Sequence, residues 1–219
     1  MQPGAAFDAF SFCERQVAIE VNAHQQNPLS NQELDCMMPV ANFDMQAVAS
    51  ALDFMRIALA PCITTQVERS MKLLQKSLTG LTDGLEPRGD SDGHGLSEIT
   101  WPLQALATEA KLLAQPVSFE IGSSCQAEGL EDRMTMAGLA ARRLLNMVHL
   151  SHRMMSISAI IAAQAIDLRG NDRLSKGLTT AHGRIRELIP ELLPGDSPPS
   201  SYEHLVKGLE DGILCGVLI

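Results

Sequence analysis

The chain has 219 residues and a formal net charge of −9, and it shows no stripe of Lys and Arg that would suit nucleic acid. Hydrophobic residues make up 45% and aromatic residues only 4%. This composition argues against a disordered chain, and it favours helices packed through Leu, Ala and Met over a β-sandwich. The five cysteines form no CxxC pair and no zinc spacing, a pattern typical of reduced thiols in a cytoplasmic protein.

The first predicted element is a helix over residues 5–21, where apolar residues recur near helical spacing. The chain leaves the helical conformation before Asn27-Pro28, because a residue that precedes proline is disfavoured in a helix. Residues 30–39 are predicted to form a loop. The amino terminus has no basic region followed by an apolar stretch, so no signal peptide is expected.

A second helix is predicted to begin near Asn42 or Asp44, and either side chain could cap it. An apolar stripe over residues 47–59 marks its buried face. Pro61 predicts a kink or an interruption, because proline removes a backbone hydrogen bond inside a helix. A continuation is expected over residues 67–78, where apolar residues again fall on one face.

Residues 80–95 contain five glycines and one proline, which predicts a loop. A helix is expected to resume near Pro102, since proline is tolerated in a first turn, and to stop at Pro116. Residues 117–129 carry no regular apolar period, so this stretch is predicted to be irregular.

The longest predicted helix covers residues 130–168, which contain no proline. About 39 residues would give a helix roughly 58 Å long. Residues 154–166 are its most apolar part, but they are too few to span a bilayer and they include polar side chains. A buried helix that needs cover on all sides is the better interpretation, and oligomerisation is expected to supply that cover.

A further helix is expected over residues 174–188, followed by a break at four prolines. Ser200 and Glu203 have the spacing of a capping box for a last short helix. We therefore expect a helical bundle over residues 1–189 and a Pro-rich linker with a terminal helix over residues 190–219.

Few residue patterns in the chain suggest chemistry by themselves. His149 and His152 share one helical face but have no obvious third metal ligand, so no metal site is expected. Glu128, Glu131 and Asp132 precede the long helix, where acidic side chains complement the helix dipole. No P-loop or GxGxxG motif occurs. The pattern alone therefore predicts an acidic, oligomeric, all-α bundle.

Six stretches of the chain resemble, in order, conserved segments of one enzyme family. The stretches are 20–29 (EVNAHQQNPL), 42–44 (NFD) with 51–60, 68–69 (ER) with 78–81 (LTGL), 109–116 (EAKLLAQP), 131–136 (EDRMTM) with 140–143 (AARR), and 162–169 (AAQAIDLR). The family contains the histidine, phenylalanine and tyrosine ammonia-lyases and the related 2,3-aminomutases. The resemblance implies an all-α fold, an elongated bundle of long helices that forms the central part of the ammonia-lyase fold.

The resemblance also implies a set of site residues. Phe43 would lie near the electrophile and the substrate, and Glu131 would be the carboxylate that faces the substrate amine. Asp44 stands where the family usually has His, and Leu130 where it has Gln, so both are expected to contact substrate. An Asp at this place would suit a cationic or hydroxyl-bearing side chain. Glu128 competes with Glu131, because the match at Glu131 needs a gap of about two residues.

The family's electrophile, 4-methylideneimidazol-5-one, forms from an internal Ala-Ser-Gly that this chain does not contain. The only tyrosine is Tyr202. The resemblance therefore implies a carboxy-terminal subunit of a split ammonia-lyase or aminomutase for aromatic L-amino acids. An amino-terminal partner chain would carry the electrophile, and self-association would give a tetramer-like, cytoplasmic assembly without nucleic acid or membrane. The alternatives are an inactive paralogue that acts as a scaffold, and a truncated product that folds poorly.

Overall fold

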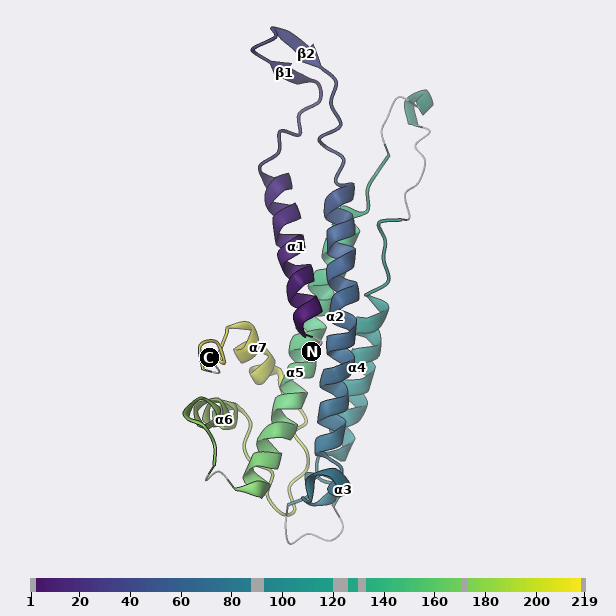
Figure 1. The fold of residues 1–219 in the computed structure, drawn as a ribbon. Coiled ribbons are helices and arrows are strands. Elements are labelled where there is room, and N and C mark those ends of the chain that lie inside the picture. Colours follow the sequence, from purple (N-terminus) through teal and green to yellow (C-terminus); the bar gives the residue numbers. More distant parts are fainter. Residues whose placement is uncertain (1–2, 88–92, 120–125, 130–132, 171–172, 218–219) are drawn as a thin grey trace. The chain divides into compact units, whose positions relative to one another are not determined.

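The computed structural model describes residues 3–87, 93–119, 126–129, 133–170 and 173–217 (Figure 1). The chain divides into two compact units. Met1–Cys62 and Lys111–Met147 form the first unit, and Ile63–Ala110 and Val148–Ile219 form the second. Helices dominate both units, which confirms the all-α prediction, and the strands found in the described ranges are two of three residues each.

The first unit begins with helix α1 (Pro3–Val21), close to the predicted bounds. A small hairpin follows, in which β1 (Leu29–Asn31) pairs antiparallel with β2 (Cys36–Met38). The prediction of a loop over 30–39 was wrong in this respect. The Asn31 side-chain oxygen accepts hydrogen bonds from the backbone N–H groups of Glu33 and Leu34, both at 3.1 Å. Asn31 thus closes the turn between strands that are too short to show a period of two.

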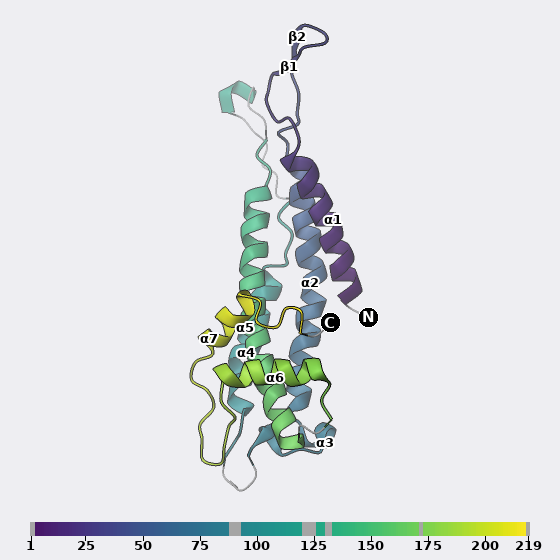
Figure 2. The ribbon, with the colours of Figure 1, turned by 90° about the vertical axis from the view of Figure 1, so that its left-hand side faces the viewer.

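The core of the first unit lies between α1 and the first half of α2 (Gln46–Leu73), which run side by side (Figures 1 and 2). The start of α5 (Ala137–Arg169) completes it. Small side chains at the contacts let the helices approach closely. The buried members of this core are Cys13, Val48, Ala51, Leu52, Val117 and Ala140.

Helix α2 continues through Pro61, so the predicted interruption does not occur. Pro61 is exposed, which places its missing N–H on the solvent side of the helix. Among the described helices, α2 alone has the length and mean hydropathy that a membrane span requires, a criterion that core helices of soluble proteins also meet. Its buried Asp53, Arg56 and Ser70 are polar groups with protein partners, as in a core helix.

The second unit contains α3 (Lys76–Thr79), most of α4 (Thr100–Leu112), α6 (Lys176–Leu188) and α7 (Glu203–Glu210), together with the later parts of α2 and α5. Figure 2 shows α6 running crosswise to α5. Short 3₁₀ turns at Asp83–Leu85 and Ser97–Ile99 lie within the predicted loop and before α4. Helices α4, α6 and α7 agree in order with the pattern of apolar residues. The continuation predicted over 67–78 is instead divided, because α2 ends at Leu73 and α3 is a separate turn of helix.

Helix α5 has 33 residues and begins at Ala137, later than predicted. The preceding 3₁₀ turn, Gln126–Gly129, has positive φ angles of 48° at Ala127 and 60° at Glu128. Residues 133–136, directly before Ala137, are not helical, so the apolar position at Met134 lies outside the helix. Residues 130–132 lie outside the described residues.

Helix α6 has the expected capping geometry, because the Ser175 hydroxyl accepts from the Leu178 backbone N–H. The predicted capping box of α7 was wrong. Tyr202 occupies the cap position and makes no side-chain cap hydrogen bond, so Ser200 lies outside the cap. The separate status of residues 190–219 stays a prediction.

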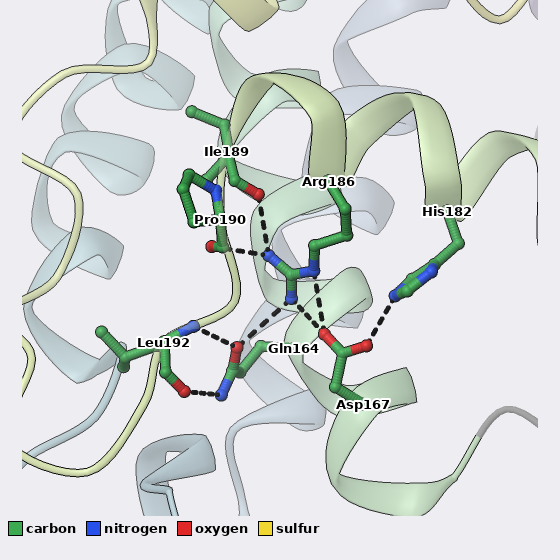
Figure 3. Close-up of polar contacts among 7 residues, drawn as sticks. All are labelled: Gln164, Asp167, His182, Arg186, Ile189, Pro190 and Leu192. Atoms are coloured by element: carbon green, nitrogen blue, oxygen red, sulfur yellow. Dashed lines mark hydrogen bonds and ion pairs between the residues drawn. The ribbon is translucent and has the colours of Figure 1, made fainter.

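The Pro-rich stretch after α6 is held by a buried polar cluster (Figure 3). Gln164 donates to the Leu192 carbonyl and accepts from the Leu192 N–H, both at 3.1 Å. Arg186 donates to Gln164, to Asp167 and to the carbonyls of Ile189 and Pro190. These contacts explain how an irregular segment satisfies its backbone polar groups without a sheet or a helix.

Candidate active site

Phe43 and Asp44 lie directly before α2 in the first unit, and both side chains are half-buried. Asp44 caps the helix, because one carboxylate oxygen accepts from the Gln46 backbone N–H at 2.9 Å. This confirms one of the two predicted caps. The cap fixes the backbone at residue 44 relative to α2, and with it the neighbouring Phe43.

The other carboxylate oxygen of Asp44 pairs with Arg133, at 2.9 Å from Nη2 and 3.3 Å from Nε. The hydrogen bond from Arg133 is the main cause that holds the pKa of Asp44 below its usual value, and the Gln46 N–H adds to it. Asp44 is therefore ionised at neutral pH. The side chains keep 29% and 50% of their surface exposed, so the pair is accessible from solvent.

Arg133 is a residue that sequence reasoning did not single out. It lies 89 residues from Asp44 in the chain, and no local pattern pairs the two. One signal in the sequence was available. Asp44 and Arg133 carry opposite charges, and each stands where the resembling family segment has histidine. The structure thus brings Arg133 to Asp44, which directly follows Phe43 in the chain.

Two of the predicted site residues, Leu130 and Glu131, lie outside the described residues, so their placement stays a prediction. The competing Glu128 is exposed, with a left-handed backbone at φ 60°. The choice between Glu128 and Glu131 stays open on geometry alone.

A second carboxylate of α2, Asp53, binds the segment that follows α4. One Asp53 oxygen accepts from the backbone N–H groups of Val117 and Ser118, both at 2.7 Å. The other oxygen accepts from Arg56, and Arg56 also donates to the carbonyls of Leu113 and Gln115. Both side chains are buried, at 3% and 0% exposure. A buried pair with every oxygen engaged avoids most of the cost of burying charge.

Burial lowers the pKa of the Arg56 guanidinium, and the nearby Asp53 carboxylate opposes that shift. The same segment is also held at the first residue of α2, where Gln46 donates to the Ser118 carbonyl at 2.9 Å. Side chains of α2 therefore bind backbone groups over residues 113–118. Farther along the chain, Arg133 binds Asp44, which caps the same helix.

His149 and His152 face Glu210 on α7, at 3.2 Å and 3.8 Å from the same carboxylate oxygen. Within the described part of the chain, no group of three or more His, Cys, Asp or Glu side chains is arranged to hold a metal ion. The two histidines therefore link α5 to α7.

The electrophile of the resembling family does not fit this chain. It forms from an Ala-Ser-Gly that the 219 residues do not contain. The groups that the structure pairs beside the start of α2 are the Asp44 carboxylate and the Arg133 guanidinium, which can orient a substrate and stabilise charge.

The sequence is similar to that of known proteins over most of its length. The sequence model described as "Aromatic amino acid lyase" matches residues 2–187. A histidine ammonia-lyase of Anaeromyxobacter dehalogenans (strain 2CP-C) is 32% identical over 212 residues, which is 96% of this chain and 41% of the relative. A histidine ammonia-lyase of Alkaliphilus oremlandii (strain OhILAs) is 30% identical over 86% of this chain and 37% of the relative.

Solved structures of similar fold extend the comparison. The ergothionase of Treponema denticola superposes with a TM-score of 0.89 and 27% identity, over 98% of this chain and 43% of that protein. The tyrosine aminomutase of Streptomyces globisporus gives a TM-score of 0.89 and 25% identity, over 98% of this chain and 40% of that protein. The chain thus has the helical fold of these proteins and spans about two fifths of their length.

Proposed function

The chain belongs to the aromatic amino acid lyase family, and from this membership we propose that it is the carboxy-terminal subunit of a split ammonia-lyase or 2,3-aminomutase. Its substrate is an aromatic L-amino acid. An amino-terminal partner chain, which contains Ala-Ser-Gly, supplies the 4-methylideneimidazol-5-one electrophile. When present, that group provides the electron-poor carbon to which the family adds its substrate.

This chain contributes a carboxylate and part of the wall of the site. Glu131 holds the substrate ammonium and takes a proton from its nitrogen, which a positioned carboxylate can do. Phe43 packs against the aromatic ring, and Leu130 and Asp44 line the substrate. Because Asp44 is already paired with Arg133, it offers the ring a polar pair rather than an isolated negative charge.

The observation that carries the proposal is the contact between Asp44 and Arg133. Arg133 lies two residues after Glu131 in the chain, and Asp44 directly follows Phe43. The ion pair therefore links the two stretches that the family resemblance assigns to the substrate. Large exposed apolar side chains on α1 agree with assembly onto further protein. These include Phe7 at 71%, Phe10 at 52% and Val21 at 77% exposure.

Turnover by the reconstituted pair tests the proposal. The chain is co-expressed with a neighbouring-gene chain that contains Ala-Ser-Gly, and the complex is assayed for arylacrylate absorbance with histidine, tyrosine and phenylalanine. A lyase gives absorbance only when both chains are present. An aminomutase is detected by chromatography of the β-amino acid. A stable complex that leaves every aromatic amino acid unchanged contradicts the proposal.

The residue assignment needs a matched pair of variants. Glu131→Gln keeps the shape of the side chain but removes the charge, so we expect a loss of turnover of at least about a hundredfold. Glu128→Gln makes the same change three residues away and should keep turnover near the unmodified level. The reverse pattern would assign the role to Glu128.

The second candidate function is a scaffold that kept the bundle and lost the reaction. The feature that favours it is the Asp44–Arg133 pair at two positions where the resembling segments carry histidine. A scaffold predicts that Glu131→Gln changes neither assembly nor any activity of the complex.

A further inference from the structure

The segment between α4 and α5 is attached to α2 at two places. At its beginning, Asp53 and Arg56 bind backbone groups over residues 113–118. At its end, Arg133 binds Asp44. Both attachments use acidic side chains of one helix and its cap. Both ends of a segment that carries a predicted site residue are therefore attached to the same rigid element, α2 with its cap.

The first attachment is buried and rigid. The Asp53 oxygen that accepts from Val117 and Ser118 does so at 2.7 Å in both cases, which is short for a backbone N–H donor and typical of a charged acceptor. Arg56 supplies the opposite charge and holds two carbonyls of the same segment. Because Val117 is itself buried, at 5% exposure, the segment cannot slide along α2 without exposing apolar surface.

The second attachment is an accessible ion pair. Arg133 keeps half of its side-chain surface exposed, so solvent weakens the pair and its loss should not unfold the protein. Two nitrogen atoms of Arg133 contact one Asp44 oxygen, at 2.9 Å and 3.3 Å. The Asp44 cap at Gln46 leaves this oxygen free to bind Arg133.

We propose that Asp53 and the Asp44–Arg133 pair are positioning residues, which fix the two ends of the segment that carries Glu131. The inference rests on the proposed function for its catalytic consequence. Asp44 is then an anchor for Arg133 in addition to lining the substrate, so Arg133→Gln is the variant that reports on positioning alone. A reacting carboxylate displaced by about 1 Å can cost up to a hundredfold in rate.

The test uses the exposed anchor, because variants of buried Asp53 can fail to fold. Asp44→Asn keeps an oxygen that can cap Gln46, and Arg133→Gln leaves the cap untouched. In the reconstituted complex, each variant should lower kcat roughly tenfold to a hundredfold, with a smaller change in KM. The double variant should be no slower than either single one, because both remove the same contact. Arg133→Lys should recover part of the lost rate.

The matched control is an exposed ion pair of the second unit. Lys207 and Asp211 on α7 lie 3.0 Å apart, with exposure comparable to or greater than that of Arg133. Asp211→Asn should leave kcat unchanged. If the Asp44 and Arg133 variants also turn over at the unmodified rate, the inference is wrong although the proposed function stands.

Hydrogen exchange of the 219-residue chain separates this inference from the proposed function. In Asp44→Asn and Arg133→Gln, the backbone amides of residues 133–136 should exchange faster than in the unmodified chain. A reconstituted complex that is silent before any substitution would end the proposed function. The anchoring would then be judged by exchange alone, and equal exchange rates in all variants would overturn it.

Discussion

The carboxylate of Asp53 faces one guanidinium and two backbone N–H groups inside the first unit. Replacing it with alanine leaves Arg56 buried without a counter-charge and two donors without an acceptor. We expect Asp53→Ala to lower the free energy of unfolding by about 3–5 kcal/mol. Urea unfolding measures the change, with exposed Asp8→Ala on α1 as the control. A loss below about 1 kcal/mol, as for an exposed pair, would contradict this account.

Asp44 makes stability depend on pH in the acid range. Its pKa is lowered in the folded state, first by the hydrogen bond from Arg133. The stabilisation is therefore complete above the ordinary aspartate value of about 3.9 and is lost as the pH falls through the lower folded-state pKa. The stability difference between the unmodified chain and Asp44→Asn should be constant near neutrality and shrink toward zero below about pH 4. A difference that does not change with pH would refute the assignment.

The thiols should differ in reactivity according to their exposure. Cys13 is buried at 7% exposure, and burial raises the pKa of its thiol, which lowers the fraction present as the reactive thiolate. Cys36 and Cys215 are exposed. Brief alkylation followed by peptide mapping should modify Cys36 and Cys215 before Cys13. Rapid labelling of Cys13 in the folded chain would mean that α1 separates from the core.

At the scale of elements, Gln164 joins the Pro-rich stretch to α5 through both polar groups of Leu192. Leu192 is buried at 7% exposure, so Gln164→Ala leaves its N–H and C=O unpaired. We expect a loss of about 1–3 kcal/mol for each unpaired group, and faster exchange of the Leu192 amide. The control is Gln104→Ala on the exposed face of α4. Equal effects at both positions would show that the segment does not depend on this contact.

Helices of this chain could be predicted where apolar residues recur over several turns and prolines mark the ends. The bounds of α1 and the presence of α4 follow from such patterns. The start of α5 was predicted too early, because Met134 continues the apolar period although residues 133–136 are not helical. The hairpin was missed because one asparagine side chain determines its turn.

The candidate site likewise contains contacts that the sequence can predict and contacts that it cannot. The cap at Asp44 is a local interaction, and the sequence predicted it as one of two alternatives, Asn42 or Asp44. The partner of Asp44 is 89 residues away, and the amide donors that Asp53 binds are more than sixty residues away. Contacts of this kind depend on tertiary packing, so no spacing in the sequence reports them. The family resemblance located the relevant stretches but did not indicate what holds them.

At the scale of the molecule, the chain covers about two fifths of the relatives that it matches, 41% in one histidine ammonia-lyase. Under the proposed function, this chain contributes a carboxylate and part of the wall of the site, and another chain contributes the electrophile. Activity should therefore depend on the ratio of the two chains and on Glu131 in this one.

The most direct measurement is a titration of the Ala-Ser-Gly chain, at fixed concentration, with increasing amounts of this chain. Turnover should rise from zero and reach its plateau at equimolar subunits. Added Glu131→Gln chain should compete for the same partner and lower the rate in proportion to its share. Turnover by the Ala-Ser-Gly chain alone, or an equal plateau with the Glu131→Gln chain, would contradict the account.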